Sequence, residues 1–191
     1  MSGRKHYATQ RQIEVFTNPL RADIFQRIVA LGPTTAPRIA ESLSLPVTSL
    51  YHHLKALVAA GVVSQAKEAA QGPGQGRPAV LYTANNRPVY LTKEIHVPGR
   101  RKQVAQIVRA SARAAAKDLG EALADPDTVL EGRRKNLSYF RSAFVASDAD
   151  LARVNALLDE LTKAALAPGS AGGQLLTITW FMSAPRRSNR S

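Results

Sequence analysis

The side chains best suited to chemistry in this sequence lie in the stretch LPVTSLYHHLKALVAAG, residues 45–61. Its apolar residues recur at steps of three and four, the spacing of one buried helix face. The polar side chains that point away from this face are Thr48, Ser49, His52 and Lys55. Hydroxyl, imidazole and ammonium groups there donate hydrogen bonds to phosphates and base edges. We expect a DNA recognition helix over 47–60, although an ordinary amphipathic helix with a solvated face fits this stretch equally well.

Catalytic and metal-binding patterns are missing from the sequence. It has no Gly-x-Ser-x-Gly, no P-loop and no strand–helix Gly-x-Gly-x-x-Gly. It also has no cysteine, so thiolate metal sites and disulfides are excluded. His52 and His53 point in different directions on a helix, and His6 and His96 have no ligand pattern around them. We therefore expect no enzyme activity, no metal and no cofactor.

Two further helices must position residues 47–60. Asn18 and Pro19 form an N-cap and first helical position, and Gly32 ends the helix that they start. A second helix starts after Thr35 and stops at the short turn 44–46. Two short helices joined by such a turn predict a helix-turn-helix.

A β-hairpin is expected directly after this motif. The alternation over 62–67 and 79–83 predicts two strands, and the intervening segment carries three glycines and two prolines. A hairpin in this position is a wing, and its tip carries Gln75 and Arg77. Arg77 either enters the minor groove or remains a solvated loop charge.

The stretch TNPLRADIFQRIVALGPTTAPRIAESLSLPVTSLYHHLKALVAAGVV, and more weakly GRPAVLY, resembles the ArsR-type winged helix-turn-helix regulators. Tyr-His-His-Leu-Lys, followed by Leu and then Ala-Gly-Val-Val, is similar to the family's recognition-helix pattern of His-His-Leu and a closing Gly-Leu-Val. This resemblance covers about a third of the chain, and it implies a dimeric bacterial transcription factor, usually a repressor, tuned by a bound effector. The chain departs from the best-known members because it lacks their metal ligands and carries a long C-terminal extension.

Position by position, the resemblance places several residues against DNA. Tyr51 is as suited to packing as to DNA contact, and His53 is better suited to packing. Arg38, at the start of the preceding helix, is suited to holding the DNA backbone. The complete set of expected DNA-binding residues is Arg38, Thr48, Ser49, Tyr51, His52, Lys55, Gln75 and Arg77.

The chain beyond the wing divides into a connector with a long helix, 85–124, and a second small module, 135–184. Helix 101–123 has an apolar stripe and a basic outer face. It either pairs two protomers, as helices in this position commonly do in the resembled family, or packs within one protomer. Residues 135–146 and 174–183 predict strands around a helix over 148–166. The aromatic side chains concentrated there suit a pocket for a small apolar effector, or ordinary core and dimer packing.

Composition supports a nucleic-acid partner. The 191-residue chain carries a formal net charge of +12 and is 45% hydrophobic, enough to bury a core. It has no apolar run of transmembrane length and no secretory h-region, so we expect a cytoplasmic protein with no membrane partner. The expected fold is mainly α with a small β part (α+β), with a winged helix-turn-helix over 13–84.

Three functions compete at this point. The first is a homodimeric regulator that binds double-stranded DNA by sequence, with or without a small-molecule effector. The second is a basic nucleoid protein that binds nucleic acid by charge alone. The third is a protein-interaction module whose winged helix no longer reads DNA.

Overall fold

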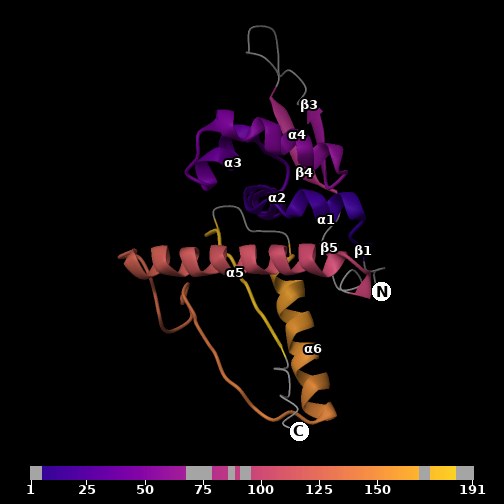
Figure 1. Ribbon diagram of the computed structural model, residues 1–191. Coiled ribbons are helices and arrows are strands. Elements are labelled where there is room, and N and C mark those ends of the chain that lie inside the picture. The colour runs from indigo at the N-terminus through magenta and orange to yellow at the C-terminus, as the bar shows by residue number, and fades with distance from the viewer. Residues whose placement is uncertain (1–5, 68–78, 86–88, 91–95, 168–172, 184–191) are drawn as a thin grey trace.

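The computed structural model describes residues 6–67, 79–85, 89–90, 96–167 and 173–183 (Figure 1). The helices are α1 (Gln10–Phe16), α2 (Pro19–Leu31), α3 (Ala36–Ser42), the 3-10 helix η1 (Val47–Ser49), α4 (Tyr51–Ala59), α5 (Arg100–Ala124) and α6 (Asp148–Ala165). The strands are β1 (His6–Tyr7), β2 (Thr34–Thr35), β3 (Val63–Lys67), β4 (Val80–Ala84) and β5 (Val89–Tyr90). The fold is therefore α+β and mainly helical, as the sequence predicts.

The hydrophobic core joins α1 to α4 and the adjacent strands. Its largest fully buried side chains are Ile13, Ile24, Ile28, Ile39, Leu50, Leu54, Leu57, Val62 and Val63. The rings of Phe16 and Phe25 pack edge to face at 5.1 Å between centroids, which fixes α1 on α2. The side chain of Asn18 accepts a hydrogen bond from the Arg21 N–H at 3.2 Å, so the predicted N-cap of α2 is confirmed.

Helices α3 and α4 end in the same hydrogen-bonded motif. After α3, the Ser44 N–H donates to the carbonyl of Glu41 and the Leu45 N–H donates to that of Ala40, at 3.0 and 2.9 Å. Gly61 makes the corresponding bond after α4. This Schellman arrangement requires a left-handed residue, and φ is 52° at Ser44 and 71° at Gly61. The turn between α3 and η1 is thus closed by a serine in a conformation that favours glycine.

A three-stranded antiparallel sheet in the order β2-β4-β3 packs against the helices. The predicted hairpin is confirmed as β3 and β4, with Gln65 opposite Tyr82 and Lys67 opposite Val80. The third strand, β2, was not predicted, and it places Thr34 opposite Tyr82 on the other edge of β4. A two-stranded parallel sheet joins β1 to β5, and β5 lies within the segment predicted to be a connector.

The first half of α5 packs on α1 and α2. Val104, Ile107 and Ala110 are its buried residues, and the Gln106 side chain donates to the Thr17 carbonyl at 3.3 Å. The apolar stripe expected on this helix is buried at Val104 and Ile107, whereas Val108 is 43% exposed and Leu123 is 66% exposed. Val108 directly follows Ile107 and therefore lies about 100° further round the helix, away from the covered side.

The C-terminal region has the predicted helix but not the predicted strands. Ser147 and Asp150 form a capping box at the start of α6. Residues 135–146 and 174–183 are described but contain no strand, so both strand predictions are wrong for the single chain. A strand requires a neighbouring strand, and neither segment pairs with one among the described residues. The backbone bonds at the start of 135–146 instead close a local turn, as in the Asn136 N–H donating to the Val129 carbonyl at 3.0 Å.

None of the described helices combines the length and the apolarity needed to cross a bilayer.

Candidate nucleic-acid interface

Helix α4 has one buried and one open face, as predicted. Leu50, Leu54 and Leu57 are fully buried against α2 and the sheet. On the opposite side Thr48, His52 and Lys55 are exposed. Figure 1 shows α3 and α4 at the end of the molecule away from α6. The polar face of α4 therefore lies on an outer surface of the described fold.

The predicted continuous helix over 47–60 is instead a 3-10 turn followed by an α-helix. The N–H and the hydroxyl of Ser49 both donate to the Pro46 carbonyl, at 3.1 and 2.7 Å. This i to i+3 pattern tightens the chain into η1 before α4 begins. Both donors of Ser49 are thus used within the turn. Thr48 is exposed, and its hydroxyl has no hydrogen-bond partner in the described part of the chain.

His52 and His53 are adjacent but differ in environment. His52 is exposed, whereas His53 is only 7% exposed. Burial lowers the pKa of His53, and the neighbouring charges of His52 and Arg21 lower it further. The His53 Nδ1 atom is buried without a hydrogen-bond partner in the described residues. The structure therefore confirms that His53 packs, and it leaves His52 as the imidazole on the open face.

Tyr51 lies at the edge between the two faces. Its side chain is 53% exposed, while Tyr82 on β4 is 7% exposed. The pKa of Tyr82 is raised by burial and then by the proximity of Tyr51. Tyr51 thus sits beside the sheet and still presents half of its surface outward. Tyr82 was not predicted as part of this surface; the alternation in 79–83 marked it only as a strand residue.

The remaining predicted residues are dispersed or lie outside the described residues. Arg38 is exposed on α3, in the turn after the N-cap residue Thr35. Gln75 and Arg77 lie outside the residues that the structure describes. The described fold therefore brings Thr48, Tyr51, His52 and Lys55 onto one helical unit, with Ser49 in its first turn.

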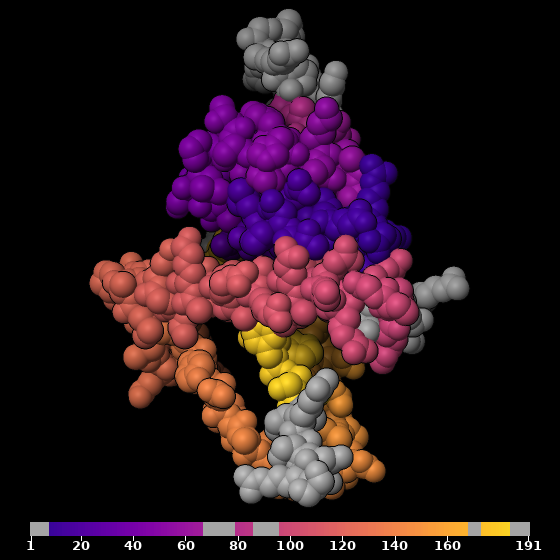
Figure 2. All heavy atoms as spheres, in the orientation of Figure 1, coloured from indigo at the N-terminus to yellow at the C-terminus, as the bar shows by residue number. Residues whose placement is uncertain are grey.

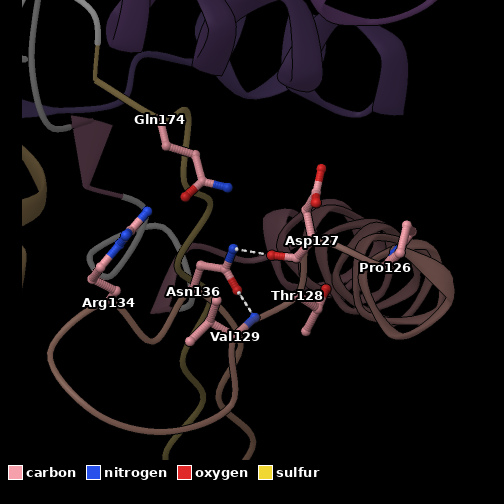
Figure 3. A pocket seen from close by; sticks show the side chains of 7 residues that line it. All are labelled: Pro126, Asp127, Thr128, Val129, Arg134, Asn136 and Gln174. Carbon is pink, nitrogen blue, oxygen red and sulfur yellow. Dashed lines mark hydrogen bonds between the residues drawn. The ribbon is translucent and has the colours of Figure 1, made fainter.

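No group of three or more His, Cys, Asp or Glu side chains converges on a metal position in the described part of the chain. A hollow of about 480 Å³ lies at the turn after α5 (Figure 3). Asn136 closes that turn: its amide oxygen accepts from the Val129 N–H at 2.8 Å, and its amide nitrogen donates to the Asp127 carbonyl at 3.3 Å. No aromatic side chain lines this hollow, so it is not the aromatic-lined pocket that the sequence allowed as one of two possibilities.

Comparison with known proteins supports the helical motif. A family model described as a helix-turn-helix domain matches residues 16–66, which span α2, α3, η1, α4 and most of β3. No curated protein matches the chain. The chain therefore contains a helix-turn-helix domain of a kind that binds DNA.

Proposed function

We propose that this chain is a sequence-specific, DNA-binding transcriptional regulator of the ArsR type, acting as a homodimeric repressor in the cytoplasm. The observation that carries the proposal is that α4 has an exposed polar face opposite a fully buried apolar face. This helix lies inside the region that the helix-turn-helix family model matches. A helix needs both faces to enter a major groove while it stays anchored to its domain.

In this proposal residues 13–84 form the DNA-binding unit. Helix α4 and the turn η1 lie in the major groove, and the wing over 62–83 follows the minor groove or the backbone. Two such units bind a palindromic site with recognition helices about 34 Å apart, one turn of DNA. Residues 85–124 connect this unit to the module over 135–184.

The exposed side chains take separate roles. His52 and Lys55 contact base edges or the nearest phosphates. Thr48 binds a phosphate through its hydroxyl, and Arg38 holds the backbone beside it. Ser49 contributes mainly by shaping η1, since both of its donors are occupied. Tyr51 packs at the start of α4 and contacts the sugar–phosphate backbone with its exposed edge. Gln75 and Arg77 make the DNA contacts of the wing.

A small-molecule effector regulates such a protein only if it binds differently to the DNA-competent and incompetent arrangements. The C-terminal module is the part of the chain left for that role, because the winged helix is filled by its own core.

The competing function is non-specific binding by charge. It is favoured by the net charge of +12, since phosphate contacts alone give affinity without sequence preference. The protein-interaction alternative is disfavoured, because Arg38 and Lys55 are both exposed on the surface expected to face DNA.

Selection of bound fragments from a random-sequence DNA pool at about 150 mM salt separates these functions, because non-specific binding is weak at that salt. We expect an inverted repeat with half-sites about one helical turn apart. Recovery of no motif, with binding that collapses as salt rises, would establish the charge-driven alternative.

A further inference from the structure

The C-terminal arm, defined as residues 135–183, has no buried side chain among its described residues. In chain order the hydrophobic core cluster ends at Ile107. Helix α6 makes no extensive contact with any other described helix or strand. Figure 2 shows the arm below α5 as an open frame, with an opening between the segment that follows α5 and the rest. In one chain the arm is thus a set of ordered elements without a core.

The arm exposes more apolar surface than an isolated protein normally tolerates. Thirteen of its large apolar side chains are at least 37% exposed, including Phe140 at 87% and Val145 at 100%. Together they leave on the order of 1,000 Å² of apolar surface in water. The largest apolar patch on a typical monomer is about 300–600 Å². A typical specific interface covers about 800 Å² on each partner, so the exposed area is that of an interface.

The two segments that failed to form strands retain the pattern of strands. In an extended chain over 174–183, Leu176, Ile178, Trp180 and Met182 lie on one face, which is apolar from residue 176 onward. The other face is mixed: Thr177, Thr179 and Ser183 share it with Leu175 and Phe181. Among the described residues no backbone hydrogen bond pairs either segment with another strand. Extended segments with unpaired N–H and C=O groups bind another strand readily. What they lack is a neighbour.

The charges of the arm and of the residues just before it indicate that the missing neighbour is a second copy of this chain. Residues 133–141 carry four positive charges and no negative one, on Arg133, Arg134, Lys135 and Arg141. Helix α6 carries four acidic residues, Asp148, Asp150, Asp159 and Glu160, against the two basic residues Arg153 and Lys163, so it is acidic on balance. Within the described residues none of these four basic and four acidic side chains forms an ion pair. One chain therefore presents both a basic segment and a helix with an excess of unpaired acidic side chains. Such a surface is complementary to itself about a twofold axis.

The shape of the arm is complementary to itself as well. An apolar groove of about 390 Å³ lies between the end of α5 and the arm, lined by Leu119, Leu123, Leu130, Leu137 and Tyr139 among others. The apolar strand face of 174–183 ends in the large side chains Trp180 and Met182. Both the groove and the side chains that suit it belong to the same chain.

We infer that the arm is exchanged between two copies of this chain. Residues 135–146 and 174–183 form strands only by pairing with strand segments of the second copy, and the apolar stripe of α6 is buried in the same assembly. The acidic helix of each copy lies against the basic segment of the other. This inference deepens the homodimer of the proposed function, and it assigns the interface to the arm, in place of α5 alone.

The first test measures mass and backbone protection on the full chain. Light scattering at about 50 μM is expected to give twice the 20.6 kDa of one chain. Hydrogen exchange is expected to protect amides in 137–146 and 175–182 at least about 100-fold over the unstructured rate. A monomer would overturn the inference. A dimer whose 137–146 and 175–182 amides exchange freely would also overturn it, because that dimer would use another surface.

Matched variants on the two faces of one strand sharpen the test. Ile178→Glu and Trp180→Glu place a charge on the apolar face, and Thr177→Glu and Thr179→Glu place the same charge on the other face. We expect the first pair to be monomeric and the second pair to remain dimeric. Equal behaviour of the two pairs would contradict the inference. Unchanged exchange of the α2 and α4 amides shows that the winged helix is still folded in each variant.

DNA selection with the same proteins keeps the two proposals apart. If the full chain is a monomer and still recovers a sequence motif, arm exchange is contradicted and sequence-specific DNA binding is supported. If the chain is a dimer with protected arm amides and recovers no motif, arm exchange is supported and sequence-specific DNA binding is contradicted.

Discussion

His52 and His53 are neighbours in the sequence with opposite surroundings, and this contrast decides what each side chain can do. Their rings lie 3.7 Å apart between centroids, yet one is exposed and the other is buried. The periodicity of the apolar residues alone predicted that His52 is exposed and that His53 packs against the domain. It did not predict that Arg21 lies close enough to His53 to affect its pKa, because that contact joins two helices distant in sequence.

His52→Ala is expected to weaken binding to the selected DNA site by about 1–3 kcal/mol if the imidazole reads a base, with little loss on random DNA. Titration of both DNAs by fluorescence anisotropy at fixed salt measures the difference. His96→Ala, an exposed histidine outside α4, is the matched control and is expected to bind both DNAs as the natural chain does. Equal losses on specific and random DNA would assign His52 to a phosphate.

His53 gives the fold a pH dependence of defined sign. Its pKa is lowered in the folded chain, mainly by burial, so the unfolded chain binds more protons below about pH 6.5. The free energy of unfolding should therefore fall as pH drops through that value. Denaturant unfolding from pH 7.5 to 5 is expected to show a smaller fall in His53→Leu, which also removes the unpaired Nδ1. An identical fall in His53→Leu and His96→Ala would show that His53 is not responsible.

Ser44 holds a left-handed conformation that its counterpart after α4 achieves with glycine. Ser44→Gly removes the Cβ conflict, and we expect stabilisation of up to about 1 kcal/mol, reduced by the greater entropy of the unfolded chain. Ser42→Gly, two residues earlier inside α3, should instead destabilise by about 0.5–1 kcal/mol. Thermal unfolding of both variants measures the two signs. Destabilisation by Ser44→Gly would contradict the strain argument.

At the scale of elements, local signals were sufficient where the element is stabilised locally. Asn18 and Ser147 cap helices, and the alternation in 62–67 and 79–83 forms a hairpin between sequence neighbours. Strand β2 escaped prediction because two threonines before a helix carry no strand signal of their own. They pair with β4 only after the chain has folded back on itself.

Residues 135–146 and 174–183 failed as predictions for a different reason. Both segments are rich in residues that favour strands, but a strand exists only in a ladder, and the single chain provides none for them among its described residues. The exposed residues of α4 were predictable because burial of the opposite face determines their direction. The two hydrogen bonds that Ser49 donates to the Pro46 carbonyl could not be predicted, because they depend on the geometry of a three-residue turn.

Two carboxyl groups, Asp23 on α2 and Asp118 on α5, repel each other, and a substitution can remove this repulsion. Burial raises the pKa of Asp23 on α2, and Asp118 on α5 raises it further. A carboxyl whose pKa is raised in the folded state makes the protein lose stability as pH rises above about 4. Asp118→Asn is therefore expected to increase the free energy of unfolding at pH 7 by up to about 1 kcal/mol. Glu121→Gln, an exposed position that pairs with Lys117 at 3.5 Å, is the control, and an equal gain there would argue against the Asp23–Asp118 conflict.

At the scale of the whole molecule, the parts proposed to bind DNA and to form the dimer lie apart. The helix-turn-helix lies at one end, the C-terminal arm at the other, and α5 lies between them (Figure 1). Every buried residue among the described ones falls between Ala8 and Ala110. The two ends therefore share no core, and their stabilities should be separable.

A fragment of residues 1–124 is expected to fold, because it holds every buried side chain that the structure describes. Its melting temperature should lie within about 5 °C of the first transition of the full chain, a shift equivalent to about 1 kcal/mol for a domain of this size. Calorimetry of both proteins measures this. An unfolded fragment would show that the arm supports the winged helix, contrary to its open arrangement.

The partial docking of α5 gives the molecule a mechanical property. Its last buried residue is Ala110, and the helix continues for about 20 Å to Ala124. Residues in this last part are half-buried or exposed, and Asp118 still lies close enough to Asp23 on α2 to affect its pKa. A tilt of about 10° at the docked end displaces the far end by about 3–4 Å. In the proposed dimer, held together at the far ends, the same tilt would move the two helix-turn-helix domains in opposite directions. The separation of the two proposed DNA half-sites would therefore depend on small changes in how α5 packs on α1 and α2.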